Sequence, residues 1–156
     1  MIAIKPHHFV DIVTSIGEGQ RQFAPHPYGH AVHTVSERIL ADPDVMLRME
    51  LGADDICAPC RYNIDGVCED TIDTSFRPLA PESKREYNLL LDRRWSARLC
   101  LRQDEELSAR ELCRRIRDGA GDITDIYREM PAEGTAERWA KLEKGLAVFL
   151  DSGDGA

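Results

Sequence analysis

The sequence predicts a mainly α-helical fold with one or two short strands, an α+β class, in a single compact domain over residues 1–150. Apolar residues recur about every 3.6 positions through most of the second half, as on one face of a helix. Two short segments of the first half alternate apolar side chains with others, which is typical of strands. The stretch after the second of them has neither pattern and is rich in cysteine, so we expect a metal-binding loop there. Residues 151–156 are small or acidic, and we expect them to form a disordered tail.

The first half opens with a weakly alternating segment, residues 1–5, that predicts a short strand. Apolar residues at helical spacing predict a helix over His7–Ile16, which Gly17 ends. After a loop with two prolines, a second helix is expected over Tyr28–Leu40, because one of its faces is apolar and a proline follows it. Val45–Leu51 then alternates well enough to predict a second strand.

The second half reads as a series of helices. The first is expected over Glu82–Leu101, where apolar side chains recur at helical spacing. Ser108 and Glu111 form a capping-box pattern for a helix that runs to about Asp118. A short helix is expected over Asp122–Met130, with Asp122 as its N-cap. Thr135 is the expected N-cap of the last helix, and its buried stripe consists of Trp139, Leu142, Leu146 and Phe149.

Composition narrows the class of protein. Apolar residues make up 42% and charged residues 31% of the chain, as in an ordinary globular protein. The formal net charge of −8 argues against a sequence-independent nucleic-acid binder. No apolar run approaches the roughly 20 residues that a bilayer span requires, so no membrane partner is expected. The N-terminus lacks the architecture of a signal peptide, and we expect a cytoplasmic protein.

Three cysteines, Cys57, Cys60 and Cys68, give the sequence its clearest chemical signal. Their C-x2-C-x7-C spacing lies in a turn-rich segment, where two thiolates can reach one metal centre and a turn returns the third. Thiolates bind zinc and iron–sulfur clusters, and either centre usually has four protein ligands. Cys100 and Cys113 lie among leucines in helical patterns, and we expect both to be packing residues.

The missing fourth ligand has candidates on the first predicted helix. His7 and Asp11, or His8 and Asp11, share a face of that helix at spacings of four and three positions. One of them can complete the cysteine site. In the alternative interpretation they form a polar cluster at the helix start, with Asp11 accepting a hydrogen bond from a histidine ring. His30 and His33 offer a weaker pair, which is either a second metal-binding face or a polar stripe.

The pattern resembles one family of small bacterial and archaeal proteins, the domain of unknown function 1284 family, which is associated with iron–sulfur binding. The resemblance covers about residues 4–70. It rests on Lys5-Pro6-His7-His8-Phe9-Val10, Gly17-Glu18-Gly19, Asp54-Asp55-Ile56-Cys57 with Cys60, and Gly66 with Cys68.

The resemblance implies a ligand set, and this chain departs from it at one position. Asp11 stands where the family pattern has its first cysteine, so the implied ligands are Asp11, Cys57, Cys60 and Cys68. They would hold an iron–sulfur cluster, with 4Fe–4S the expected form. A carboxylate holds iron less tightly than a thiolate does, which would leave one iron exchangeable. The same set, or three cysteines and a histidine, would also suit zinc.

Three functions follow from these observations. The first is a cluster-binding protein that takes a small molecule at its open iron, with His7 and His8 as catalytic proton-transfer groups. The second is a small redox or cluster carrier that serves a partner protein. The third is a structural or regulatory zinc protein.

Overall fold

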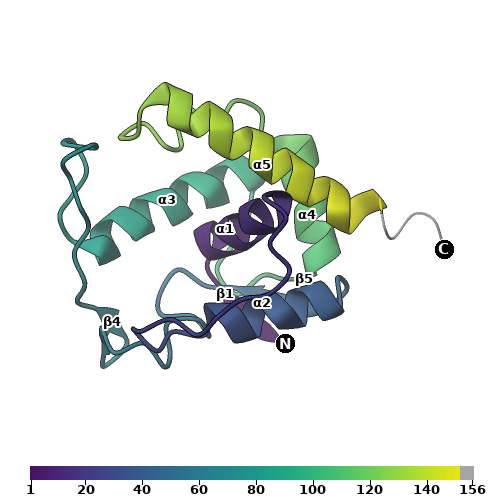
Figure 1. The fold of residues 1–156 in the computed structure, drawn as a ribbon, viewed down its shortest axis with the longest axis horizontal. Helices are drawn as coiled ribbons and strands as arrows, with labels where there is room; N and C mark the ends of the chain where they lie inside the picture. Colours follow the sequence, from purple (N-terminus) through teal and green to yellow (C-terminus); the bar gives the residue numbers. More distant parts are fainter. Residues whose placement is uncertain (152–156) are drawn as a thin grey trace.

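Helix α1 (Pro6–Gly17) lies at the centre of the fold, and the other elements pack around it (Figure 1). The structure is a computed structural model that describes residues 1–151. Most side chains of α1 are buried, and Pro6 stands in its first turn, where no backbone donor is needed. Helix α5 (Ala132–Asp151) packs along α1, and the two backbones come closest at Gly17 of α1 and Gly145 of α5. A Cβ on Gly145 would overlap the carbonyl oxygen of Val13.

A small three-stranded sheet packs beside the helices. Strand β1 (Ile2–Ile4) pairs in parallel with β2 (Met46–Met49), and β2 pairs antiparallel with β5 (Glu106–Ser108). The strand order is therefore β1-β2-β5, with β1 at one edge. The first two strands confirm the sequence-based expectation, whereas β5 was not expected.

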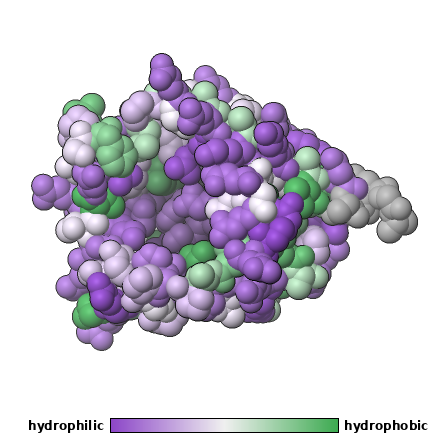
Figure 2. Space-filling view, in the orientation of Figure 1, coloured by the Kyte–Doolittle hydropathy of each residue, from purple (hydrophilic) through white to green (hydrophobic). Residues whose placement is uncertain are grey.

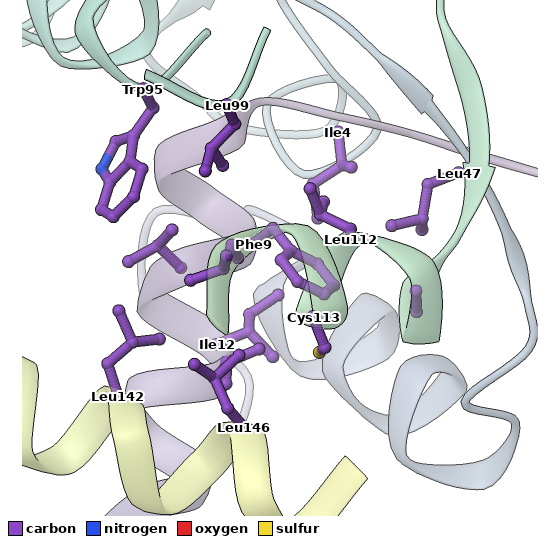
Figure 3. Packing of buried hydrophobic residues seen from close by; sticks show 14 of the residues in the cluster. Ile4, Phe9, Ile12, Leu47, Trp95, Leu99, Leu112, Cys113, Leu142 and Leu146 are labelled. Carbon is purple, nitrogen blue, oxygen red and sulfur yellow. The ribbon is translucent and has the colours of Figure 1, made fainter. Parts of the chain in front are cut away.

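The core joins the sheet to α1, α3 (Lys84–Leu99), α4 (Ala109–Gly119) and α5. Figure 3 shows Phe9 and Ile12 of α1 lying between Leu112 of α4 and Leu146 of α5. These side chains are at most 3% exposed. The mainly helical α+β class is confirmed, with five helices in the described residues.

Helix α4 is the element whose start the sequence located best. Its N-cap is Ser108, whose hydroxyl accepts a hydrogen bond from the Glu111 backbone N–H at 3.1 Å. The Glu111 carboxylate accepts one from the Ser108 backbone N–H at 2.7 Å. This is the predicted capping box, with both reciprocal bonds formed.

Two helix starts differ from the prediction by three residues or more. Helix α2 covers Val32–Ala41 and begins four residues later than expected, because Gly29 takes a φ of +76° and the chain before it turns. Helix α5 begins at Ala132, three residues before the expected cap. Thr135 is a buried residue inside its first turn, 3% exposed, and not a cap.

The helix predicted over Asp122–Met130 is wrong, because this segment consists of turns. Asp122 accepts hydrogen bonds from the backbone N–H and hydroxyl of Thr124, at 2.9 and 2.6 Å. This local turn competes with helix formation, as short acidic side chains often do.

The cysteine-rich segment contains a hairpin where the sequence pattern predicts only a loop. Strand β3 (Asn63–Ile64) pairs antiparallel with β4 (Val67–Cys68). Between them, Asp65 and Gly66 have φ of +52° and +84°, the positive values that a two-residue hairpin turn requires.

The chain ends in α5 as far as the structure describes it. The disordered tail predicted over residues 151–156 lies outside the described residues except for Asp151, the last residue of α5. Within residues 1–151, no helix has both the length and the apolar character that a bilayer crossing demands.

Candidate metal centre

The fold brings Cys57, Cys60 and Cys68 together around shared space. The backbone N–H of Cys60 donates to the Cys57 carbonyl at 2.9 Å, which makes a tight turn of the C-x2-C step. The hairpin then returns the chain, and Cys68 pairs with Asn63 across β3 and β4. All three cysteines are half-buried, and all three line the same two cavities, each of about 300 Å³.

The two cavities contact different faces of helix α3. The first cavity is lined by Arg85, Leu89 and Arg93, which are four positions apart on α3. The second is lined by another face of α3 and by the start of α1. Figure 2 shows the surface hollowed between α3 and the segment that carries β4, with hydrophilic side chains around the hollow.

Asp54 organises the start of the cysteine segment. Its carboxylate, 2% exposed, accepts hydrogen bonds from the backbone N–H of Lys5 at 2.8 Å and of Cys57 at 2.9 Å. It also bonds Nδ1 of His8 at 2.7 Å. Burial alone would raise the pKa of Asp54, but the His8 ring and the two backbone donors outweigh it and hold this pKa well below its usual range. Asp54 is therefore an ionised anchor for three separate parts of the chain.

Asp55 ties the same segment to the sheet. Its carboxylate accepts a hydrogen bond from the Ala3 backbone N–H at 2.9 Å, and its own N–H donates to the Ala3 carbonyl at 3.0 Å. The cysteine segment is thus fixed to the outer side of β1, immediately before α1 begins.

His8 is oriented by Asp54. Because an ionised carboxylate can only accept, Nδ1 of His8 carries the proton and Nε2 is left for a ligand. Burial and the neighbouring His7 lower the pKa of His8, despite the bond to Asp54. Burial and the charge of Asp54 raise the pKa of the Cys57 thiol to about 11. Ligand atoms of His8, Asp54 and Cys57 all lie within 4.8 Å of one another, as in a site for a metal ion.

His7 has a carboxylate partner of its own on α3. Asp92, fully buried, accepts from both the backbone N–H and Nδ1 of His7 at 2.8 Å. Burial opposes the charged form of His7, but the charge of Asp92 and its hydrogen bond outweigh burial and raise the pKa of the histidine. The second oxygen of Asp92 has no hydrogen-bond partner in the described residues. His7 and His8 are thus two imidazoles, each held at Nδ1, with ring centres 4.3 Å apart.

Asp11, the expected fourth ligand, lines the second cavity but has another partner. Arg138 of α5 donates to it at 2.9 Å, and the Asp11 side chain is 51% exposed. It lies outside the close group formed by His8, Asp54 and Cys57. The alternative in which Asp11 bonds a histidine ring is wrong, because Arg138 is the hydrogen-bond partner of Asp11 among residues 1–151, and Asp54 and Asp92 are the partners of the two rings.

The remaining candidate residues are the second histidine pair and the two cysteines outside the cysteine-rich segment. His30 lines the second cavity, but it precedes α2, so it does not share a helix face with His33 as predicted. Cys113 is fully buried, as expected. Cys100 is exposed, so its predicted packing role is wrong. It is the C-cap of α3, with a φ of +53°, and the helical pattern does not continue through it.

Sequence reasoning missed three partners of the site. Asp54 and Asp55 directly precede the first cysteine, and a short acidic side chain before a turn commonly bonds its backbone. Asp92 stands between Leu91 and Trp95 on the buried face of α3, where a charged residue needs a partner. Both features can be seen in the sequence, but neither of them identifies the residue that forms a hydrogen bond with the aspartate.

Comparison of the chain with known protein families, with curated proteins and with solved structures finds no match. The geometry of the centre therefore carries the functional argument.

Proposed function

We propose that the chain is a cytoplasmic iron–sulfur protein whose cluster is held by Cys57, Cys60, Cys68 and His8. The observation that carries this proposal is the position of the three cysteines, which line two adjoining cavities together, the second of them shared with His8. Thiolate sulfur with one imidazole nitrogen is a donor set that iron–sulfur centres use. The resemblance to the domain of unknown function 1284 family supports the same cofactor.

The space beside the cysteines favours a cluster over a closed structural zinc ion. A structural zinc site is closed by its four protein ligands and needs no cavity beside the ion. Here the cysteines adjoin two cavities of about 300 Å³ each, which is ample for a cluster and for a small ligand beside it. Zinc bound by three cysteines and His8 is the alternative that metal analysis distinguishes.

We assign Asp54 to holding His8, because three donors already occupy its carboxylate oxygens. Asp11 is placed outside the ligand set, because Arg138 pairs with it. His7 stands beside the centre with Nε2 left to hydrogen-bond a ligand. When bound, an iron–sulfur cluster supplies either one-electron transfer to a partner protein or a Lewis-acid position for a small molecule.

Anaerobic purification with analysis of iron, acid-labile sulfide and zinc tests the proposal. We expect a coloured protein with iron and sulfide, and we expect Cys57→Ser, Cys60→Ser and Cys68→Ser each to lose most of both. Cys100→Ser is the matched control, because Cys100 is exposed and lines neither cavity. Its metal content should equal that of the unchanged protein.

The fourth ligand is tested by His8→Ala against Asp11→Ala. The first variant should lose the centre, or bind it so weakly that it is oxidised rapidly in air. The second should keep it. The opposite result would restore Asp11 as the ligand, and full metal content in all three cysteine variants would end the proposal of a metal centre.

A further inference from the structure

The first cavity is lined by positive charges, although the molecule as a whole is acidic. Among residues 1–151, its charged lining residues are Lys5, Arg85 and Arg93, and no Asp or Glu lines it. The chain as a whole has 28 acidic and 20 basic residues. A concave, purely cationic site on an acidic protein focuses a positive potential and attracts anions.

Lys5 is the innermost of these cations. It is 7% exposed, although lysines are rarely buried unless they are paired. No salt bridge to Lys5 forms among residues 1–151. Lys5 also lines the second cavity, so it stands beside the three cysteines at the point where the two cavities adjoin.

The two arginines are unpaired in the described part of the chain, unlike their neighbours on α3. Arg94 pairs with Glu129 at 2.7 Å, and Arg98 pairs with Asp125 at 2.6 Å. Arg85 and Arg93 have no such partner, although both lie on the same helix. A guanidinium matches carboxylate and phosphate oxygens with two parallel hydrogen bonds, so two unpaired ones facing one cavity suit an oxyanion.

The rest of the wall is largely apolar. Leu51, Val67 and Leu89 also line the cavity. Its volume of about 300 Å³ is at the lower end of small-molecule sites. The ligand that fits this combination is small, with an anionic head group and a short apolar body.

We infer that the first cavity binds a small organic anion, a carboxylate or phosphate with a short apolar chain, against Lys5, Arg85 and Arg93 beside the three cysteines. The role of this ligand, as a substrate at the metal centre, rests on the proposed function. Its binding does not, because it requires the three cations and not the metal. Loss of metal and loss of anion binding are therefore separate results.

Fluorine NMR of trifluorobutanoate with the purified full-length chain tests the inference. Binding should broaden the ligand signal, and added butanoate should reverse the effect. Butylammonium, of the same shape and opposite charge, should not compete. Binding should weaken as ionic strength rises, because the attraction is between charges. Inorganic phosphate as competitor distinguishes the head groups, and competition by phosphate without any by butanoate would overturn the apolar part of the assignment.

Charge-removing variants locate the site. Arg85→Gln with Arg93→Gln should weaken trifluorobutanoate binding at least tenfold, with unchanged iron content. Arg102→Gln is the matched control, since its side chain is 87% exposed and lies outside both cavities. Lys5→Gln should weaken trifluorobutanoate binding by a similar factor. Circular dichroism will check that this variant is folded. Equal binding by the double variant and the control, or no binding by a chain with its full metal content, would overturn the inference.

Discussion

At the scale of single residues, one buried carboxylate joins the start of α1 to the cysteine segment. Asp54 receives donors from the end of β1, from α1 and from the first cysteine of the metal segment. Asp55, its neighbour, is exposed and its carboxylate accepts from Ala3 alone. The two aspartates differ in burial and in number of partners, which makes each the natural control for the other.

Asp54→Asn should lower the free energy of unfolding by about 2–4 kcal/mol. The NH2 of the amide would face N–H groups that now donate hydrogen bonds to a carboxylate oxygen. Asp55→Asn should cost less than about 1 kcal/mol. Urea unfolding of both variants measures the difference. Equal losses would show that Asp54 is not the anchor that its hydrogen bonds indicate.

The two cysteines outside the metal segment should differ in reactivity. Burial raises the pKa of the Cys113 thiol to about 12, and this residue is 0% exposed, whereas Cys100 is exposed at the end of α3. Only the thiolate is nucleophilic, so iodoacetamide should modify Cys100 in the folded protein and leave Cys113 intact until it unfolds. Peptide mass spectrometry after a timed reaction checks this, and rapid loss of Cys113 under native conditions would contradict it.

The candidate site shows what residue patterns can and cannot predict. Three closely spaced cysteines in a turn-rich segment predict a metal centre, and the structure places all three in the lining of the same two cavities. The spacing on a helix also linked His7 and His8 with Asp11, but helical neighbours share a face without necessarily sharing a partner. The partners are Asp54 and Asp92, which are 46 and 85 residues away in the sequence, and only the packing of α1 against the other elements brings them in.

At the scale of elements, the contact between α1 and α5 depends on glycine. A Cβ on Gly145 would overlap the carbonyl oxygen of Val13, and one on Gly17 would overlap that of Lys141. Backbone lies on both sides of the contact, so neither helix can yield by moving a side chain. The helices can approach this closely only because both positions lack a side chain.

Gly145→Ala should therefore lower the free energy of unfolding by about 2–3 kcal/mol, since the two helices must separate to admit a methyl group. Gly134→Ala, in the same helix with open space around it, should raise it by about 0.5–1 kcal/mol, because alanine favours the helix. Thermal unfolding of the pair measures both signs. A similar effect of the two substitutions would mean that the crossing can relax at little cost.

Elements with a strong local signal were predicted, and those that depend on distant partners were not. The apolar content of α1 and the capping box of α4 both act within one helix, so the sequence alone reveals them. Strand β5 has three residues and exists because β2 pairs with it. The hairpin had a usable signal, an Asp-Gly pair, but its strands have two residues each, too few to show alternation.

At the scale of the whole molecule, two buried titrating groups away from the metal segment make the fold sensitive to alkali. Burial raises the pKa of Cys113 above its ordinary 9.0 and that of Tyr127 above its ordinary 10.0. Trp95 donates a hydrogen bond to the Tyr127 hydroxyl at 3.0 Å in the same buried region. Both groups are neutral in the folded chain and lose protons more readily when it unfolds.

The sign of the effect follows from this difference. Because the folded-state pKa is the higher one, the contribution to stability is complete below the unfolded value and is lost as pH rises past it. The urea midpoint should therefore begin to fall as pH rises past the ordinary value of 9.0 for Cys113 and should keep falling toward its folded-state value of about 12. Tyr127→Phe should show a smaller fall than the unchanged chain. An equal fall in both would assign the alkaline loss to other groups.

The way the metal segment meets the sheet has a consequence for self-association. Strand β1 is an edge strand with three buried residues, Ile-Ala-Ile, and its outward backbone groups are taken by Asp54 and Asp55 and not by another strand. A second chain cannot add to this edge unless it displaces both aspartates. If the cysteine segment detached from β1, through loss of metal or through oxidation, the apolar edge of this strand would be exposed. An exposed apolar strand edge is the usual template for aggregation. On the proposed function, a bound cluster would hold this segment in place and so protect the protein from self-association.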